Sequence, residues 1–173
     1  DGTLIYPKRN SDTFGCAMSS DEENLYNLTT EYIHAYYNKA SILNRSAARL
    51  AMSVFQRRLT SSTWALLRSF ERRQKKLDVL IADINSGRIS ENELDARQRK
   101  LGSGLPEPLD AKTADEEDGE ENEGIEERAL GGVAAVSVSE LQAERAQVTM
   151  LLELAREVDE KGDESKFDRL REL

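Results

Sequence analysis

The chain has 173 residues, of which 38% are hydrophobic, 33% are charged and only 6% are aromatic, and its formal net charge is −9. This composition can form apolar stripes along helices but excludes a thick core between two β-sheets, and the three prolines and ten glycines favour a mainly α fold. Because Cys16 and His34 are the single cysteine and the single histidine, an internal disulfide and a cysteine-histidine zinc site are excluded as well.

The first predicted elements are an extended lead-in and a helix. Residues 1–19 are expected to be extended, with one short N-terminal strand over Thr13–Met18 between polar turns. A capping box that begins at Ser20 and includes Glu23 opens a helix over about 21–38. Its apolar residues recur every three or four positions and are Leu25, Leu28, Tyr32, Ala35 and Tyr36.

Two further helices are expected to form an antiparallel, coiled-coil-like arm. An apolar stripe from Ala47 to Leu59 predicts a second helix that ends near Thr60. The pair Ser61–Ser62 can cap a third helix that ends before Gly87. The seven-residue recurrence in the third helix is typical of coiled coils. Its apolar residues are Leu66, Leu67, Phe70, Leu77, Leu80, Ile81 and Ile84.

The second half of the sequence predicts a short helix, a linker and a return helix. A second capping box at Ser90 starts the short helix, so the helical protrusion covers 20–100. The chain from Pro108 to about Arg128 is acidic and nearly free of large apolar side chains, which predicts a long disordered acidic linker over 101–136. A helix over 137–162 should return along the third helix. The helical pattern of 163–173 continues to the last residue, as expected of a fragment of a longer protein.

Positive and negative charges are concentrated in different segments. Residues 110–127 contain ten acids and one lysine, a local net charge of −9, whereas residues 39–76 contain ten basic residues and one acid, a local net charge of +9. Such a basic cluster can neutralise phosphates, although a solvated helix surface is an equally common outcome. We expect contact with the sugar-phosphate backbone, without sequence preference. The candidates for contact with duplex DNA are Arg57, Arg58, Arg68, Arg72, Arg73, Lys75 and Lys76.

No catalytic, cofactor-binding or metal-binding residue is predicted. The sequence has no P-loop pattern, and His34 is better explained as a packed or surface side chain than as a catalytic base. Trp64 could stack on a nucleobase, but packing at a helix junction is the more frequent outcome. The absence of about 18 consecutive apolar residues and of a signal-peptide pattern predicts a soluble, cytoplasmic chain with no membrane contact.

Three segments resemble SWI/SNF-type helicase-like ATPases, in the order in which that family has them. Residues 7–33, with Pro7-Lys8, EENLY and LTTEYI, are similar to the region that leaves the first RecA-like lobe. Residues 47–73 (AARLAMSVFQRRLTSSTWALLRSFERR) resemble the helical insertion of bacterial RapA-like members, including those associated with phage defence. Residues 163–173 (DESKFDRLREL) resemble the helix that introduces the second lobe.

The resemblance implies that the chain is the helical region between the two lobes of an ATP-dependent translocase. Residues 1–19 would then leave the first lobe and residues 163–173 would begin the second. The lobes of the parent protein would bind ATP and Mg²⁺, so no cofactor is expected in this chain. Its expected partners are duplex DNA and the two lobes, and the arginines could instead pair with acids of those lobes.

The alternative hypothesis comes from a different class of protein. A free-standing coiled-coil module would recruit a protein partner, or a second copy of itself, through an exposed apolar stripe. It would have no role in an ATPase.

Overall fold

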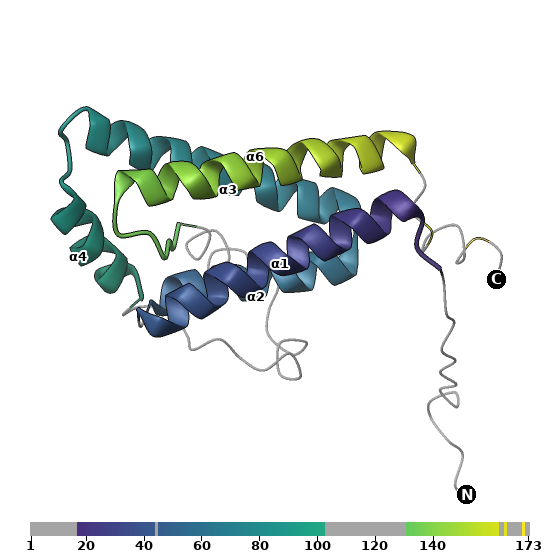
Figure 1. Ribbon diagram of the computed structural model, residues 1–173, viewed down its shortest axis with the longest axis horizontal. Coiled ribbons are helices and arrows are strands. Elements are labelled where there is room, and N and C mark those ends of the chain that lie inside the picture. The colour runs from purple at the N-terminus through teal and green to yellow at the C-terminus, as the bar shows by residue number, and fades with distance from the viewer. Residues whose placement is uncertain (1–16, 44, 103–130, 163–164, 166–170, 172–173) are drawn as a thin grey trace, which may run out of the picture.

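The computed structural model describes residues 17–43, 45–102, 131–162, 165 and 171. These residues are mainly α-helical, as predicted. The strand expected over Thr13–Met18 lies mostly outside them, and its last two positions have no regular secondary structure. The helices are α1 (Ser20–Ile42), α2 (Ser46–Ser61), α3 (Thr63–Asn85), α4 (Glu91–Gly102) and α6 (Val138–Lys161), as Figure 1 shows.

Side-chain caps determine where the helices begin. The N-cap of α1 is Ser19 and not Ser20, so the helix starts one residue earlier than predicted. The Ser19 hydroxyl accepts a hydrogen bond from the Glu22 amide at 3.3 Å, and the Glu22 carboxylate accepts one from the Ser19 amide at 2.7 Å. Serine side chains also cap α3, α4 and α6, and these are Ser62, Ser90 and Ser137.

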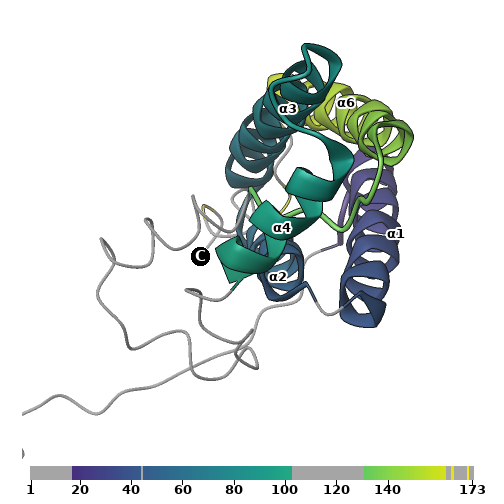
Figure 2. The ribbon, with the colours of Figure 1, turned by 90° about the vertical axis from the view of Figure 1, so that its left-hand side faces the viewer.

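The four long helices form two antiparallel pairs, α1 with α2 and α3 with α6 (Figure 1). The predicted return of the last helix along α3 is thereby confirmed. Helix α2 packs more extensively along α1 than along α3, which it contacts as far as Phe55, so the expected pairing of α2 with α3 is observed in part. The pairs converge at the end that holds this corner, the start of α1 and the end of α6, here called the corner end. They diverge toward the α4 end, where α4 lies across the opening (Figure 2).

An aromatic cluster joins the two helix pairs in the core. Tyr32 of α1, Phe55 of α2 and Phe70 of α3 are all 0% exposed. The ring centroids of Phe55 and Phe70 are 5.0 Å apart, and Tyr32 meets Phe55 edge-on at 5.7 Å. Helix α6 contributes the aliphatic residues Leu141, Val148, Leu151, Leu152, Ala155 and Val158. The apolar stripes that the sequence pattern predicts therefore face one another inside the bundle.

Residues 131–135 belong to the core and not to a linker. The prediction of a flexible linker over 101–136 is wrong for this part, because three of its residues are at most 1% exposed: Val133, Ala134 and Ala135. An added Cβ at Gly132 would lie 2.4 Å from the carbonyl carbon of Ala47, so only glycine permits this close approach to α2. The rest of the predicted acidic linker, residues 103–130, lies outside the described residues.

Helix α4 is attached to the bundle by polar side chains. The Nη2 atom of Arg45, at the start of α2, donates to the Oδ1 atom of Asp95 at 2.6 Å. The side chain of Gln98 pairs with the backbone of the segment that follows residue 130: it donates to the carbonyl of Gly131 at 3.3 Å and accepts from the amide of Val133 at 2.9 Å. This pairing satisfies backbone groups of a core segment that has no helix or strand of its own.

Candidate nucleic-acid interface

Six of the seven basic candidates lie on the outside of α2 and α3. Two are half-buried in the last turns of α2, and four follow on α3, where only Lys76 is half-buried and the others are exposed. Neither α2 nor α3 has an acidic residue in its first turn. Since Arg68 and Arg72 are four residues apart, they share one side of the helix. We call the set the basic face: Arg57, Arg58, Arg68, Arg72, Lys75 and Lys76.

Arg73 is the exception, and its prediction as a nucleic-acid contact is wrong. Its side chain is 0% exposed and lies in the interior with Phe70 and Leu77. Its Nε and Nη2 atoms donate to Oε1 of Glu144 at 2.9 and 2.5 Å, and its Nη1 atom donates to the carbonyl of Gly132 at 2.5 Å. A guanidinium with these partners cannot reach a phosphate while the bundle is folded.

Glu144 is the centre of a buried polar network between α1, α3 and α6. The hydroxyl of Tyr32 donates to the same Oε1 atom at 3.0 Å. Burial raises the pKa of Tyr32 well above its usual range, and the charge of Glu144 raises it further. Burial alone would lower the pKa of Arg73, but the attraction of Glu144 outweighs this effect and the pKa is raised. The guanidinium is therefore charged, and its role is structural.

The sequence contains a signal for this network that charge counting misses. Arg73 falls on the apolar stripe of α3, between Phe70 and Leu77. Glu144 falls on the apolar stripe of α6, between Leu141 and Val148. Opposite charges at core positions of two helices that are expected to pack together predict a buried ion pair, because neither charge could be buried alone.

Trp64 lies at the start of α3, beside the basic face. Its 56% exposure shows that the more frequent outcome, packing at the helix junction, does not occur. The interior positions of this turn are taken instead by the buried residues Ala65, Leu66 and Leu67. The guanidinium of Arg68 lies over the indole, with its Cζ atom 5.4 Å from the ring centroid. An exposed aromatic ring thus adjoins the predicted cations.

Between Arg68 and Lys76, α3 has one acidic residue, and Asp78 and Asp83 follow farther along the helix. Glu71 binds Arg68 at 2.7 Å and Arg156 of α6 at 3.3 Å. The hydrogen bond from Arg68 is the main reason why the pKa of Glu71 is lowered. Because the carboxylate of Glu71 is shared by two arginines, Arg68, Glu71 and Arg156 together keep a net positive charge.

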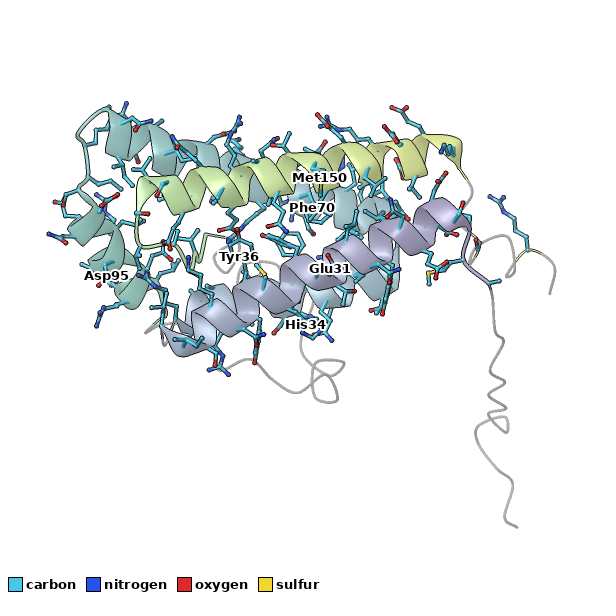
Figure 3. The ribbon with its side chains drawn as sticks, in the orientation of Figure 1. Glu31, His34, Tyr36, Phe70, Asp95 and Met150 are labelled. Atoms are coloured by element: carbon cyan, nitrogen blue, oxygen red, sulfur yellow. The ribbon has the colours of Figure 1, made fainter. Side chains whose placement is uncertain are left out.

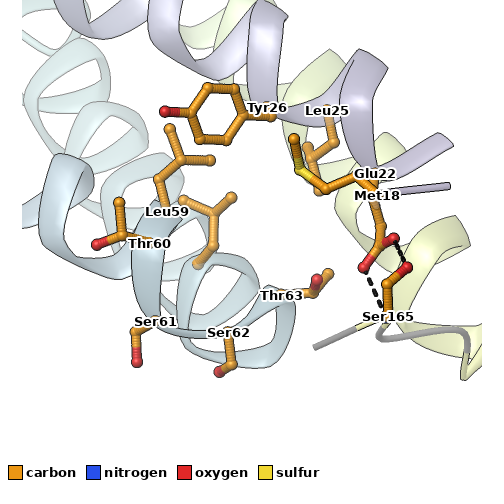
Figure 4. Close-up of a pocket in the computed structure, with 11 residues that line it drawn as sticks. Met18, Glu22, Leu25, Tyr26, Leu59, Thr60, Ser61, Ser62, Thr63 and Ser165 are labelled. Atoms are coloured by element: carbon orange, nitrogen blue, oxygen red, sulfur yellow. Dashed lines mark hydrogen bonds between the residues drawn. The ribbon is translucent and has the colours of Figure 1, made fainter. Parts of the chain in front are cut away.

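A small pocket opens at the corner end (Figure 4). Its volume is about 270 Å³, which has room for one or two side chains and is at the lower limit of small-molecule sites. At its rim, Glu22 accepts a hydrogen bond from the amide of Ser165 at 3.1 Å and another from its hydroxyl. Its lining is mainly apolar, with hydroxyl groups on one side: Met18, Leu25, Tyr26, Leu59, Leu66 and residues 60–63.

Other kinds of site find little support in the part of the chain that the structure describes. There, no group of three or more His, Cys, Asp or Glu side chains could hold a metal ion, and no helix has the length and apolarity needed to cross a membrane. His34 is exposed on the outer side of α1 (Figure 3), and Cys16 lies outside the described residues. Comparisons with protein-family models, curated proteins and solved structures find no match for this chain.

Proposed function

We propose that this chain is the helical inter-lobe region of a SWI/SNF-type, RapA-like ATP-dependent translocase. In that role it positions the two RecA-like lobes and contacts the DNA backbone through the basic face. The proposal starts from the resemblance of residues 7–33, 47–73 and 163–173 to that family. Phosphate-binding and metal-binding groups for ATP and Mg²⁺ would be supplied by the lobes.

The observation that carries the proposal is that α1 begins beside the point where α6 ends. The Nζ atom of Lys161 donates to the carboxylate of Asp21 at 2.5 Å, and Ser165 donates to Glu22. A helical segment inserted between two lobes must leave and return at one place, and this arrangement meets that requirement (Figure 1). The α2–α3 corner is at the same end, so Arg58 and Arg68 would be close to both lobes and to a duplex that they hold.

The alternative hypothesis, a free-standing coiled-coil module, requires an apolar stripe that a partner can reach. The stripe of α3 is instead turned inward, and Leu66, Phe70 and Leu77 are at most 1% exposed. This burial supports the inter-lobe proposal over the module. Sedimentation of the purified chain tests the point, because a coiled-coil module should self-associate or require a partner whereas an inter-lobe bundle should be monomeric.

The test of DNA contact is the binding of a labelled duplex at two salt concentrations. A variant with Arg57, Arg58, Arg68 and Arg72 changed to Gln removes four charges from the basic face and leaves the buried Arg73 intact. If all four contact phosphates, raising the salt from about 50 to 200 mM should weaken binding by the original chain about 100-fold more than binding by the variant.

A matched control removes four charges at the α4 end, through Arg88, Arg97, Arg99 and Lys100 changed to Gln. This control should bind the duplex nearly as well as the original chain. Equal losses in the two variants would mean that only overall charge matters, and no binding by any form would contradict the DNA contact. The purified chain should not hydrolyse ATP, and measurable turnover would contradict the proposal as a whole.

A further inference from the structure

We infer that Trp64 and the cations that follow it on α3 bind single-stranded nucleic acid. One unpaired base would stack on the indole, and the adjoining phosphates would lie against Arg68, Arg72 and Lys75. We call these four residues the stacking stripe. The inference rests on the proposed function, and it narrows the ligand from the duplex backbone in general to strand ends and unpaired stretches.

The spacing of the stacking stripe places its side chains along one side of α3. Its members follow one another at intervals of four, four and three residues, and all four are exposed. Neighbours at such intervals have Cβ atoms about 6 Å apart, and eleven residues of helix extend over roughly 16 Å. The stripe is therefore a nearly straight row with an aromatic ring at one end and three cations after it.

The exposure of the indole suits it to stack against a flat ring. Trp64 is 56% exposed, although the fold has an aromatic core that it could have joined. In the free chain the Arg68 guanidinium lies over the ring and binds Glu71 at 2.7 Å. A nucleobase that took the place of this guanidinium would leave Arg68 available for a phosphate. Such stacking contributes about 1–3 kcal/mol per base.

The positive charge around the Trp64 indole favours a negatively charged polymer as the partner of this surface. Among residues 39–76, Glu71 is the one acid, and two arginines already share it. An acidic protein would match the charge but would offer no series of aromatic faces, whereas single-stranded nucleic acid offers a phosphate and a base at every step. A closed duplex offers the phosphates but keeps its bases stacked inside.

The intrinsic fluorescence of Trp64 provides a direct test, because it is the one tryptophan of the chain. The chain is titrated at low salt with a thymidine oligonucleotide of about 12 residues, a blunt duplex, inorganic polyphosphate and polyglutamate. The oligonucleotide should quench the emission strongly, since a stacked base contacts the indole. The duplex, polyphosphate and polyglutamate should quench it weakly even where they bind.

Substitution of Trp64 distinguishes the contribution of the indole to binding from that of the neighbouring cations. Trp64→Leu should weaken binding of the oligonucleotide about 10-fold and leave binding of the duplex nearly unchanged, and Trp64→Phe should lose less. The matched control is Ile42→Ala, which removes an 84% exposed apolar side chain at the end of α1 and should change neither affinity. Trp64 and Ile42 are both at the surface, so the three variants are expected to fold.

Each remaining outcome overturns the inference in a distinguishable way. If the oligonucleotide did not quench the emission of Trp64 and bound Trp64→Leu as tightly as the original chain, the inference would be overturned. Salt-sensitive binding of the duplex would in that case still support the proposed function. Quenching by polyglutamate as strong as by the oligonucleotide would assign the surface to an acidic protein. Binding of neither nucleic acid would overturn the inference and the proposed DNA contact together.

Discussion

The two ends of the helix bundle are stabilised in different ways. At the corner end the long helices converge, and Asp21 and Glu22 make polar contacts near the surface with Lys161 and Ser165. Apolar side chains there stay partly exposed, among them Met18, Tyr26 and Trp64. At the α4 end the helices diverge, and the chain fills the gap itself with α4 and with small residues around Gly132.

This difference shows that the α4 end is closed by the chain's own residues, whereas the corner end exposes groups that can bind a partner. The α4 end owes its stability to burial and to close backbone approach, so its buried residues should be sensitive to a change of size or charge. The corner end combines a pocket, an exposed indole and a basic face, so its residues should affect binding more than stability. The free energy of unfolding in urea, measured for variants at the two ends, tests this contrast.

The largest effect is expected for Glu144→Leu. The substitution leaves the buried guanidinium of Arg73 without its counter-charge, which should cost about 3–5 kcal/mol of stability. The double variant Arg73→Met with Glu144→Leu should recover most of the loss, because it buries no unpaired charge. Asp78→Asn, which breaks the exposed pair with Arg145, should cost less than about 1 kcal/mol. Similar costs for Glu144→Leu and Asp78→Asn would contradict the structural role of the network.

The next largest effect is expected for Gly132→Ala. The added Cβ would lie 2.4 Å from the backbone of Ala47, so α2 or the segment at 131–135 must shift, at a cost of about 1–3 kcal/mol. Gly162 provides the comparison at the corner end, because nothing lies within 4 Å of its Cβ position and only its φ of +67° opposes substitution. Asn should therefore be tolerated at Gly162 and not at Gly132. Equal tolerance at the two sites would refute the close approach.

A smaller effect is expected for Ser62→Ala. The Ser62 hydroxyl accepts from the Ala65 amide at 3.1 Å and caps α3, and its loss should cost about 1 kcal/mol. Because Trp64 is two residues away, its emission should change together with the unfolding midpoint. Ser137→Ala, which removes the cap of α6, should cost a similar amount and leave the emission of the folded state unchanged. An altered emission in both variants would contradict a local effect.

The smallest effect is a dependence on pH at the corner end. Burial alone would raise the pKa of Glu22, but hydrogen bonds from Ser165 and Ser19 outweigh it and the pKa is lowered below 4.5. A carboxylate whose pKa is lower in the folded state contributes stability above its unfolded pKa, and this contribution is lost as the pH falls through the folded value. Glu22→Gln should therefore be less stable than the original chain at pH 7, by less than about 1 kcal/mol. The difference should decrease as the pH falls through the lowered pKa of Glu22. A difference independent of pH would contradict the role of ionisation.

Much of the fold can be predicted because helix starts depend on a few local residues. Serine caps mark the starts of α3, α4 and α6, at Ser62, Ser90 and Ser137, and Gly162 marks the end of α6. A serine cap satisfies free amides of the first helical turn whatever the helix packs against, so it can be recognised from the local sequence. The pairing of the helices is harder, because an apolar stripe indicates that a side is buried and not which helix buries it. For this reason the sequence pattern predicts α2 along α3, whereas α2 packs more extensively along α1.

The candidate site is predicted only in part, since composition does not separate exposed from buried groups. Counting cations identifies the basic face but also includes Arg73, whose position on the stripe of α3 assigns it to the core. The small residues at 131–135 resemble a linker in the sequence. Their packing depends on the close approach of Gly132 to α2, and a glycine contact of this kind adds no large apolar residue to the sequence pattern. The exposure of Trp64 follows from the tertiary fold and has no local signal.

The two hydrogen bonds of Gln98 have a consequence for the way in which the bundle opens. They connect α4 with Gly131 and Val133, on either side of the close contact of Gly132 with α2. Because one amide side chain pairs with both backbone groups, α4 and residues 131–135 should separate from the bundle as one unit. Replacing Gln98 with leucine should let them separate independently, and the Val133 amide should then exchange its hydrogen faster.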